Sequence, residues 1–491
     1  MVVESFNITR ILADAEKSLK EDTSLSPGLR ALVGTLVALV QVLVNRLGVN
    51  SRNSSKPPSQ DPNRKRKAKT GKLGRKAGGQ PGREGVCLQQ VDNPDEVVEL
   101  KIDRTELPLP DDAYYPSGRV DVRQVIEIKL NKHIVEYQAE ILVGLDGSVV
   151  KAPFPSGVTQ PIQYGASVKA RAVYQSQSQL IPYERVCEEF EEQFGLPISP
   201  GSIANFNEEA YRRLEDFEKI AKQQLNRAST IHGDETGINV NGKRLWLHVA
   251  SNRHWTFLFP HPKRGLEAME EMEILKSYRG FFCHDHWKAY FHFQNCTHVL
   301  CNAHHLRELK YAEEQDNQSW AKRMGELLLE INKVVTDAGG YLDKKTDASY
   351  RKKYRAILAQ GEKECPPPER SSEPPERKRV KKTKSRNLLE RLRDFEYETL
   401  LFMTNELVPF TNNQGERDLR MSKVQQKISG CFRSFQGAKY FCRIRSYLST
   451  CRKNGISATA ALDLLFAGKL PSFIKPPPKI RREQRQKRPK L

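Results

Sequence analysis

Apolar residues recur with a heptad spacing near the N-terminus. Leucines occupy every third or fourth position from Leu29 to Leu43, directly after Ser26-Pro27. This spacing places them on one side of a helix of about two heptads, and a Ser-Pro pair is a typical helix start. We therefore expect a short coiled-coil or bundle helix, which packs either on its own chain or on a second copy of the protein.

The pattern then changes from strands to helices. Val97–Ile102 and Val120–Leu130 carry alternating or β-branched residues between Pro, Asp and Gly, which indicates short strands. Pro182–Phe194 and Ser202–Glu218 have helical spacing and flank a turn that begins at Gly195. Two helices joined by such a turn are typical of helix-turn-helix DNA readers, and also of other helical hairpins. Contact of this hairpin with DNA is one of two open interpretations.

A regular order of strands and helices begins at Ser229. Asn241-Gly242 is a strong hairpin signal, because both residues tolerate positive φ. The expected strands are Ser229–Asp234, Arg244–Ser251, His254–Pro260, Gly280–His284 and Thr297–Cys301, and the expected helices are Lys263–Ser277, Trp287–Phe293 and a long helix from about Ala303. Three strands followed by alternating helices and strands is the order of the ribonuclease H-like fold, in which the first and fourth strands are central neighbours.

The following segment interrupts this order. Tyr311–Leu400 is largely helical and charged, but prolines at 366–368 and 374–375 break any helix there. A basic stretch, Glu376–Arg386, follows these prolines. We interpret the segment as a helical insertion with an exposed basic loop. Helical patterns return over Asn387–Glu406, from Asn413 to about Lys423, and towards the end of Phe432–Asn454.

Composition adds a partner to this picture. The chain has 491 residues with 80 Lys and Arg against 60 Asp and Glu, a formal charge of +20. Such a surplus favours a polyanionic partner, most commonly nucleic acid, although two charged tails on a soluble protein would give the same number. Basic residues are densest in the Pro- and Gly-rich stretch from about Asn50 to Gly85, which we expect to be disordered and to contact phosphates; the alternative is a solvated linker. The candidates for DNA contact there are Arg64, Lys65, Arg66, Lys67, Arg75 and Lys76.

A second basic group has helical spacing. Arg417, Arg420, Lys423 and Lys427 lie three or four residues apart, which places them along one side of the helix expected from Asn413. We expect this side to contact phosphates; the alternative is a solvated basic face.

Cysteine use and the apolar runs bear on the compartment. The nine cysteines are odd in number and scattered, which favours free thiols in a reducing compartment. Met1–Lys20 is mixed polar and charged, unlike a secretory signal. The apolar run Ala31–Val44 is shorter than the ~18 residues that a membrane span needs. We expect a cytoplasmic, nucleoid-associated protein that does not interact with membranes.

Three carboxylates stand at matching places in the expected fold. Asp234 ends the first strand and Asp285 ends the fourth, so both would meet at one edge of the sheet. Glu416 lies in the first turn of a later helix and can complete the cluster. The alternative is that all three are structural, as a strand end, a helix N-cap and a first-turn residue favoured by the helix dipole.

Such a cluster suits metal-dependent cleavage of a phosphodiester. Two Mg²⁺ ions about 3.5–4 Å apart can serve both oxygens of an in-line displacement, and Mn²⁺ can replace them. Mg²⁺ takes oxygen ligands and keeps several waters, so two or three carboxylates suffice. Asp234 would bridge both ions, and Asp285 and Glu416 would each hold one.

Four groups of residues resemble motifs of the insertion sequence 66 family of transposases. In chain order they are Asn53–Ser59 with Gly78–Gly82, similar to a basic linker; His232–Thr236, similar to the first catalytic aspartate motif; Asp285–Tyr290 with Cys301–Arg307, similar to the second; and Asn412–Arg420 with Gly437-Ala438, similar to the glutamate motif. The resemblance runs from the leucine-rich helix to about Phe466, and the order of the motifs makes it specific.

The resemblance implies a DDE transposase of a bacterial insertion sequence, with a ribonuclease H-like core interrupted by a helical insertion. Asp234, Asp285 and Glu416 would be its catalytic and metal-binding residues. It would bind terminal inverted repeats, expose 3′-OH ends and join them to target DNA, as a homo-oligomer and with accessory proteins of the same element as further partners. The alternatives are a DNA-binding remnant, a metal-dependent nuclease that no longer transposes, or a basic DNA-packaging protein in which the three carboxylates would not converge.

Two positions depart from the family pattern. Family members often carry cysteine pairs of a small zinc-binding domain near Val86–Val150, where this chain keeps only Cys87, so no zinc is expected there. Thr411 stands where the family commonly has Asp. A less favoured zinc site would use residues from the expected strand ends, namely Cys283, His284, Cys301, His304 and His305.

We therefore expect a multidomain α+β protein. Its segments are a helix or coiled-coil segment (1–50), a basic disordered linker (51–85), a small β-rich domain resembling a degenerate zinc finger (86–155), a helix-turn-helix-like region (156–226), the first segment of the catalytic core (227–310), a helical insertion with a basic loop (311–400), the second segment of the catalytic core (401–470) and a basic tail (471–491).

Overall fold

The protein has a mixed α+β structure in two units. The computed structural model describes residues 2–475, except 4–5, 22–23, 55–60, 64–87, 104–105, 107, 109–112, 114, 116–118, 129 and 369–381. One unit comprises residues 65–138, and the other comprises residues 1–64 and 139–491. The basic candidates Arg64, Lys65, Arg66, Lys67, Arg75 and Lys76 lie outside the described residues.

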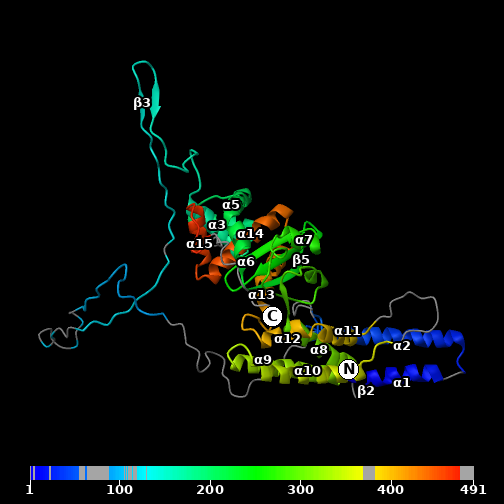
Figure 1. Cartoon of the computed structure of the whole chain (residues 1–491). Helices are drawn as coiled ribbons and strands as arrows, with labels where there is room; N and C mark the ends of the chain where they lie inside the picture. Colours follow the sequence, from blue (N-terminus) through cyan, green and yellow to red (C-terminus); the bar gives the residue numbers. More distant parts are fainter. Residues whose placement is uncertain are drawn as a thin grey trace. The chain divides into compact units, whose positions relative to one another are not determined.

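Five strands form one mixed sheet in the larger unit (Figure 1). They are β5 (Thr230–Val240), β6 (Lys243–Ser251), β7 (Thr256–His261), β8 (Phe281–His284) and β9 (Thr297–Leu300), in the order β7-β6-β5-β8-β9. β5 pairs antiparallel with β6 and parallel with β8, and β8 pairs parallel with β9. The expected pairing of the first and fourth strands is therefore confirmed.

Helices precede, connect and follow the strands. Those before the sheet are α3 (Ala166–Val173), the π-helix η4 (Tyr174–Ser178), α4 (Tyr183–Phe194), α5 (Pro200–Arg213) and α6 (Glu215–Arg227). The connecting α7 (Leu266–Glu271) and 3₁₀-helix η5 (Lys288–His292) are short, and α13 (Asn413–Ser429), α14 (Phe435–Lys453) and α15 (Ala458–Phe466) come after the last strand.

These helices bury both faces of the sheet, because alternate strand residues point to opposite sides. Ile231 and Phe257 belong to the core that is completed by α3, α5, α6, α14 and α15. Leu247 and Leu258 belong to a second core that includes side chains of α13 and α14. The sheet is thus packed between two helical layers. The ends of its strands are where a site can form.

Two predicted helices differ from those observed. The helix expected over Ser202–Glu218 begins at Pro200, where Ser199 accepts a hydrogen bond from the Ser202 N–H at 3.1 Å, and it gives way to α6 at Leu214. The helix expected over Lys263–Ser277 is limited to α7. Glu273 has a φ of 62°, which no right-handed helix accommodates.

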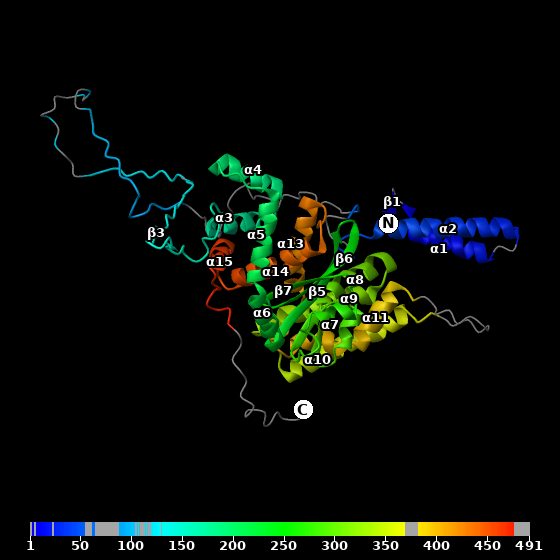
Figure 2. The same cartoon turned by 90° about the horizontal axis from the view of Figure 1, so that it is seen from above.

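Four long helices between β9 and α13 form the helical bundle. They are α8 (Asn302–Asp316), α9 (Ser319–Asp337), α10 (Lys344–Glu364) and α11 (Lys384–Asp394), followed by the short α12 (Glu396–Leu400) and η6 (Leu401–Met403). In Figures 1 and 2 the four helices, coloured yellow-green to gold, lie side by side. Their core includes Trp320 and Tyr354 and also takes Cys283 and Val299 from β8 and β9, so the bundle packs on the sheet.

The N-terminal residues form a helical pair, α1 (Ile8–Glu21) and α2 (Pro27–Gly48), preceded by the short strands β1 (Val2–Val3) and β2 (Phe6–Asn7). The expected helix start is confirmed, because Ser26 Oγ accepts a hydrogen bond from the Leu29 N–H. Leucines from Leu29 to Leu43 are about half exposed despite the contact with α1. Of the described helices, α2 alone has the length and apolar composition that a membrane span needs. One such helix near the N-terminus is weak evidence for a membrane span.

The chain after α2 returns to the helical bundle. Asn53 is buried and donates hydrogen bonds to the Gly48 carbonyl at 2.9 Å and to Glu314 on α8 at 3.0 Å. These contacts hold the first residues of the expected linker against α8.

The prediction of strands at Val97–Ile102 and Val120–Leu130 is wrong for the residues that the structure describes. The described residues of Val97–Ile102 and Val120–Leu130 form no strand, and their apolar side chains are exposed. Alternation alone does not stabilise a strand, which also needs a paired neighbour and a covering layer. The regular β-structure of the described residues between 86 and 155 is one hairpin of β3 (Ile141–Val143) and β4 (Val149–Lys151).

Candidate active site

The parallel pairing of β5 and β8 places two aspartates at one level of the sheet. Its register joins His232 to Cys283. Asp234 and Asp285 each lie two residues further along these strands. Asp285 follows the end of β8 and accepts a hydrogen bond from the Trp287 N–H at 2.9 Å. β5 continues along β6 beyond Asp234, so Asp234 does not end its strand as predicted.

Helix α13 brings Glu416 to the same place. Asn412, at the helix N-terminus, is buried and donates to the Gly233 carbonyl at 2.7 Å, and its Oδ1 is 2.9 Å from His232 Nδ1. Its own N–H donates to Cys301 Sγ at 3.0 Å. A Cβ added at Gly415 would be 3.4 Å from the Asp234 Cβ, so glycine permits this close approach. The first turn of α13 is therefore fixed against β5.

Replacing Asn412 by Ala should loosen this junction. The change leaves the Gly233 carbonyl and His232 Nδ1 without partners, and each unsatisfied buried group costs about 1–3 kcal/mol. We expect the free energy of unfolding to fall by about 3 kcal/mol, measured by chemical denaturation. The neighbouring Asn413→Ala, an exposed position, is the control. Equal stability of the two variants would contradict the proposed role of Asn412.

Like charges gather around Asp234. Burial raises the pKa of Asp234 well above its usual range, and the negative charges of Glu235, Asp285 and Glu416 raise it further. Three carboxylates therefore lie close enough to Asp234 to disfavour its negative charge. Mutual repulsion of this kind is costly without a cation, and it is typical of functional sites.

Glu235 forms an ion pair with Arg264 and lies next to Asp234. Its side chain is 2% exposed and accepts from Arg264 at 3.0 and 2.6 Å and from the Tyr290 hydroxyl at 2.5 Å. The Arg264 guanidinium lies 4.9 Å from the ring centre of Trp246 and 4.5 Å from that of Trp287. Arg264 thereby connects β6 and the segment after β8 to the residue that follows Asp234.

Basic side chains of α8 face Glu416. Arg307 Nη2 is 3.4 Å and His304 Nε2 is 3.9 Å from Glu416 Oε1. Burial lowers the pKa of His304, and the neighbouring Arg307 lowers it further. His304 also lines a cavity of about 180 Å³ together with Asp285 and Arg264. The helical bundle thus contributes one wall of the site.

The donor set fits a hard divalent cation. Asp234 and Asp285 accept only backbone N–H bonds from the described chain and form no ion pair with it. Carboxylate oxygens without a counter-charge are suitable ligands for such an ion. The three candidate ligands do not all lie within 4.8 Å of one another. In the described chain that spacing occurs at His261, Glu267 and Glu271, an exposed acidic group in which Glu267 already pairs with Lys263.

The residues of the less favoured zinc site have other partners. Cys301 Sγ accepts from Asn412, and His284 lies 2.9 Å from His298. His305 Nδ1 lies 3.1 Å from Asn302 Oδ1. Cys283 packs in the core of the helical bundle. None of the described Cys, His, Asp and Glu groups brings these five residues together at metal-ligand spacing. The described cysteines are free thiols, as expected.

Comparison with known protein families identifies the chain. The profile of the transposase IS66 family matches residues 161–440, which is more than half of the chain and includes all three carboxylates. The chain belongs to the IS66 family of transposases. A family of unknown function matches residues 8–88, which include α1 and α2. No match was found among curated proteins.

Membership in the IS66 family makes DNA the expected partner of this transposase and a divalent metal its expected requirement. The second basic group lies on α13, next to Glu416. Arg417, Arg420, Lys423 and Lys427 are exposed along this helix, and Lys423 donates to the Gly237 carbonyl at 2.7 Å. The expected basic helix side therefore exists on the transposase, adjacent to the carboxylates.

Sequence patterns did not reveal three supporting residues of the transposase. Asn412 stands within the glutamate motif, but nothing in the sequence indicated its contacts with Gly233 and His232. Glu235 follows Asp234 directly, but its partner Arg264 lies before α7, in a segment that was expected to belong to a helix. Arg307 was recognised as a member of a motif, whereas its contact with Glu416 depends on how α8 packs against α13.

Proposed function

We propose that this transposase is a metal-dependent polynucleotidyl transferase that cleaves and joins DNA strands with Asp234, Asp285 and Glu416. The observation that carries the proposal is the placement of these three carboxylates: the parallel register of β5 and β8 puts Asp234 and Asp285 at one level, and Asn412 holds the first turn of α13, with Glu416, against β5. A basic DNA-packaging protein has no need for such a cluster. Family membership supports strand transfer over other metal-dependent chemistry.

We further propose that β5 to β9 form a ribonuclease H-like core. The strand order β7-β6-β5-β8-β9, with β5 between an antiparallel and a parallel neighbour, supports this assignment. The core would comprise residues 227–310 and 401–470, and the helical bundle would be an insertion into it. This division explains why Glu416, distant in sequence from Asp234, belongs to the same site.

Asp234, Asp285 and Glu416 would hold Mg²⁺ or Mn²⁺. When bound, such ions neutralise charge on the phosphate and activate the attacking water or hydroxyl. The protein supplies orientation: Asn412 fixes the helix of Glu416, and Arg264 fixes the segment beside Asp234. Arg307 would offset the negative charge of Glu416 and restrict the movement of its side chain.

The DNA substrate would lie along the exposed basic side of α13. Arg417, Arg420 and Lys423 point to a phosphate backbone that passes next to Glu416, and backbone contacts position DNA without reading its sequence. We assign the terminal inverted repeats of an insertion sequence as the substrate, bound by an oligomer that holds two DNA ends. The helical hairpin of α4 and α5 is the candidate reader of sequence, supported by its left-handed Gly195 turn.

Metal binding tests this proposal before any DNA sequence is known. Mg²⁺ or Mn²⁺ is titrated into the full-length protein and into Asp234→Asn, with binding followed by calorimetry and Mn²⁺ relaxation. We expect stoichiometric binding to the unaltered protein and loss of at least one ion in the variant, because a buried ligand is removed. The titration is repeated with bound DNA. Identical binding by both proteins under both conditions would leave a DNA-binding remnant as the better description.

A further inference from the structure

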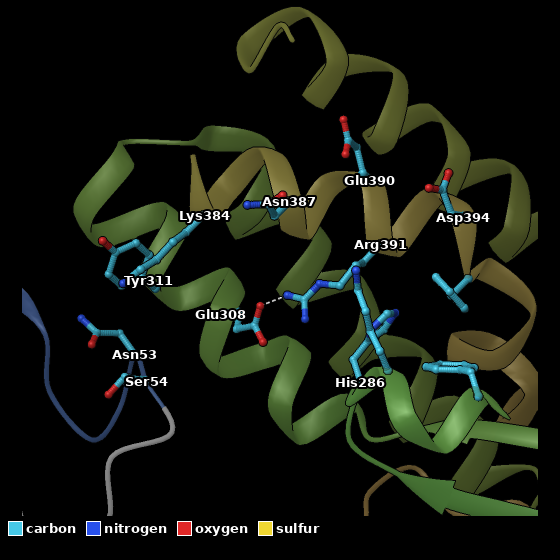
Figure 3. A pocket seen from close by; sticks show the side chains of 13 residues that line it. Asn53, Ser54, His286, Glu308, Tyr311, Lys384, Asn387, Glu390, Arg391 and Asp394 are labelled. Atoms are coloured by element: carbon cyan, nitrogen blue, oxygen red, sulfur yellow. Dashed lines mark hydrogen bonds and ion pairs between the residues drawn. The ribbon is translucent and has the colours of Figure 1, made fainter. Parts of the chain in front are cut away.

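A second, larger cavity lies beside the candidate active site (Figure 3). Its volume is about 930 Å³, and its walls come from α8, α11, the segment after β8 and the residues after α2. His286, Glu308 and Arg391 line both this cavity and the smaller one that contains Asp285. The larger cavity therefore adjoins the smaller cavity, which contains Asp285, at these three residues.

One wall of this cavity is aromatic. The Phe291 and Phe395 ring centres are 4.9 Å apart, and the His286 ring lies edge-on at 4.5 Å from Phe395. Tyr311 on α8 also lines the cavity, with Lys384 Nζ over its ring at 4.3 Å. Aromatic faces of this kind stack on nucleobases of any sequence.

The carboxylates of the wall are already neutralised. Glu308 forms an ion pair with Arg391, which Figure 3 shows crossing the cavity wall. Glu390 pairs with Lys382 and Arg386, and Asp394 pairs with Arg393. The acidic lining therefore presents little net negative charge to a ligand.

Two lysines line the cavity, and one of them, Lys384, lies over the ring of Tyr311. Lys288 and Lys384 are exposed and line it, and neither forms an ion pair with the described residues of the chain. The cavity thus combines aromatic faces with unpaired positive charge. This is the chemistry that recognises a nucleobase together with its phosphate.

We propose that this cavity holds an unpaired nucleotide of the DNA end that is processed at Asp285. The inference rests on the proposed function, since it needs DNA at the carboxylates. A cavity of this size is in the range of small-ligand sites and is too small for a duplex. A nucleotide released from pairing beside the reacting phosphate would stack against Phe291 and Phe395, with its phosphate near Lys288 or Lys384.

The test compares DNA ends in the absence of divalent metal, so that no cleavage occurs. The full-length protein is titrated with a short blunt duplex and with the same duplex carrying a 3′ or a 5′ single-stranded extension, and binding is followed by fluorescence anisotropy. We expect one extension to bind about tenfold more tightly than the blunt end. We expect Phe291→Leu with Phe395→Leu, and separately Lys288→Gln with Lys384→Gln, to remove this preference.

Photochemical crosslinking locates the unpaired base. The preferred extension carries 5-iodouracil, and the attached peptide is identified by mass spectrometry; we expect attachment at Phe291, Phe395 or Tyr311. Lys352→Gln, an exposed lysine outside the cavity, is the control and should keep the preference. Equal binding of blunt and extended ends, or attachment confined to other segments, would overturn the proposal. Because the assay needs no metal, it fails or succeeds independently of the Asp234→Asn titration.

Discussion

Asp234→Asn is expected to reduce DNA strand cleavage at least a thousandfold while leaving DNA binding intact. The negative charges of Asp285 and Glu416 both act on Asp234. Replacing the Asp234 carboxylate by an amide therefore removes the proposed ligand that lies near both of the others. A thousandfold loss corresponds to about 4 kcal/mol of transition-state stabilisation, within the range that metal ions supply. Cleavage of DNA carrying the element's ends, in Mg²⁺ and in Mn²⁺, measures the effect.

Two companion variants and one control define the result. Asp285→Asn and Glu416→Gln should show losses of similar size, because in the proposed mechanism the three side chains act as one unit. Asp216→Asn on α6, whose carboxylate is exposed and pairs with Lys219, should cleave normally. Retention of more than a tenth of the cleavage rate by Asp234→Asn would exclude the triad as the catalytic group.

Trp320→Ala is expected to have the largest effect on stability. Trp320 is a residue of α9 and is fully buried, and its indole N–H donates to Gln318 at 2.9 Å. A Cβ added at Gly361 would approach its ring to about 3 Å, so α10 packs directly upon it. Truncation of a buried tryptophan costs about 3–5 kcal/mol, through lost burial and the cavity that remains. Chemical denaturation followed by circular dichroism measures the change.

The conservative variant separates packing from the hydrogen bond. Trp320→Phe keeps a ring in place and removes the N–H, so we expect it to lose less than half as much stability as Trp320→Ala. Hydrogen exchange should show faster exchange in α8, α9 and α10 of the Ala variant than in α5 and α6. Uniform protection throughout the Ala variant would show that the bundle does not depend on this residue.

Local patterns predicted the sheet because its determinants are local. The β5–β6 hairpin depends on Asn241 and Gly242, whose φ angles of 48° and 78° few other residues adopt. Parallel pairing then places Asp234 and Asp285 together through strand order alone, without knowledge of their neighbours. Glu416 was predicted from its position in the first turn of a later helix and in a motif, and a Cβ at the preceding Gly415 would lie 3.4 Å from the Asp234 Cβ.

Features that depend on distant packing were not predicted. Glu235 meets Arg264 across 29 positions and Tyr290 across 55, and nothing in either local sequence indicates the contact. The large cavity exists because α11 packs alongside α8, although α9 and α10 lie between them in the sequence. The strands expected before residue 140 failed for the opposite reason: their alternation is local, but no described layer covers it.

The bond between Asn412 and the Gly233 carbonyl joins residues separated by 179 positions. During synthesis, β5 and β8 leave the ribosome well before α13, with the whole helical bundle in between. Contacts of such long range form late, because closing a long loop costs entropy that only subsequent packing recovers. The nascent transposase therefore holds two aspartates without their glutamate until most of the chain has been made. Under the proposed function, the carboxylate site is complete only after α13 has been synthesised.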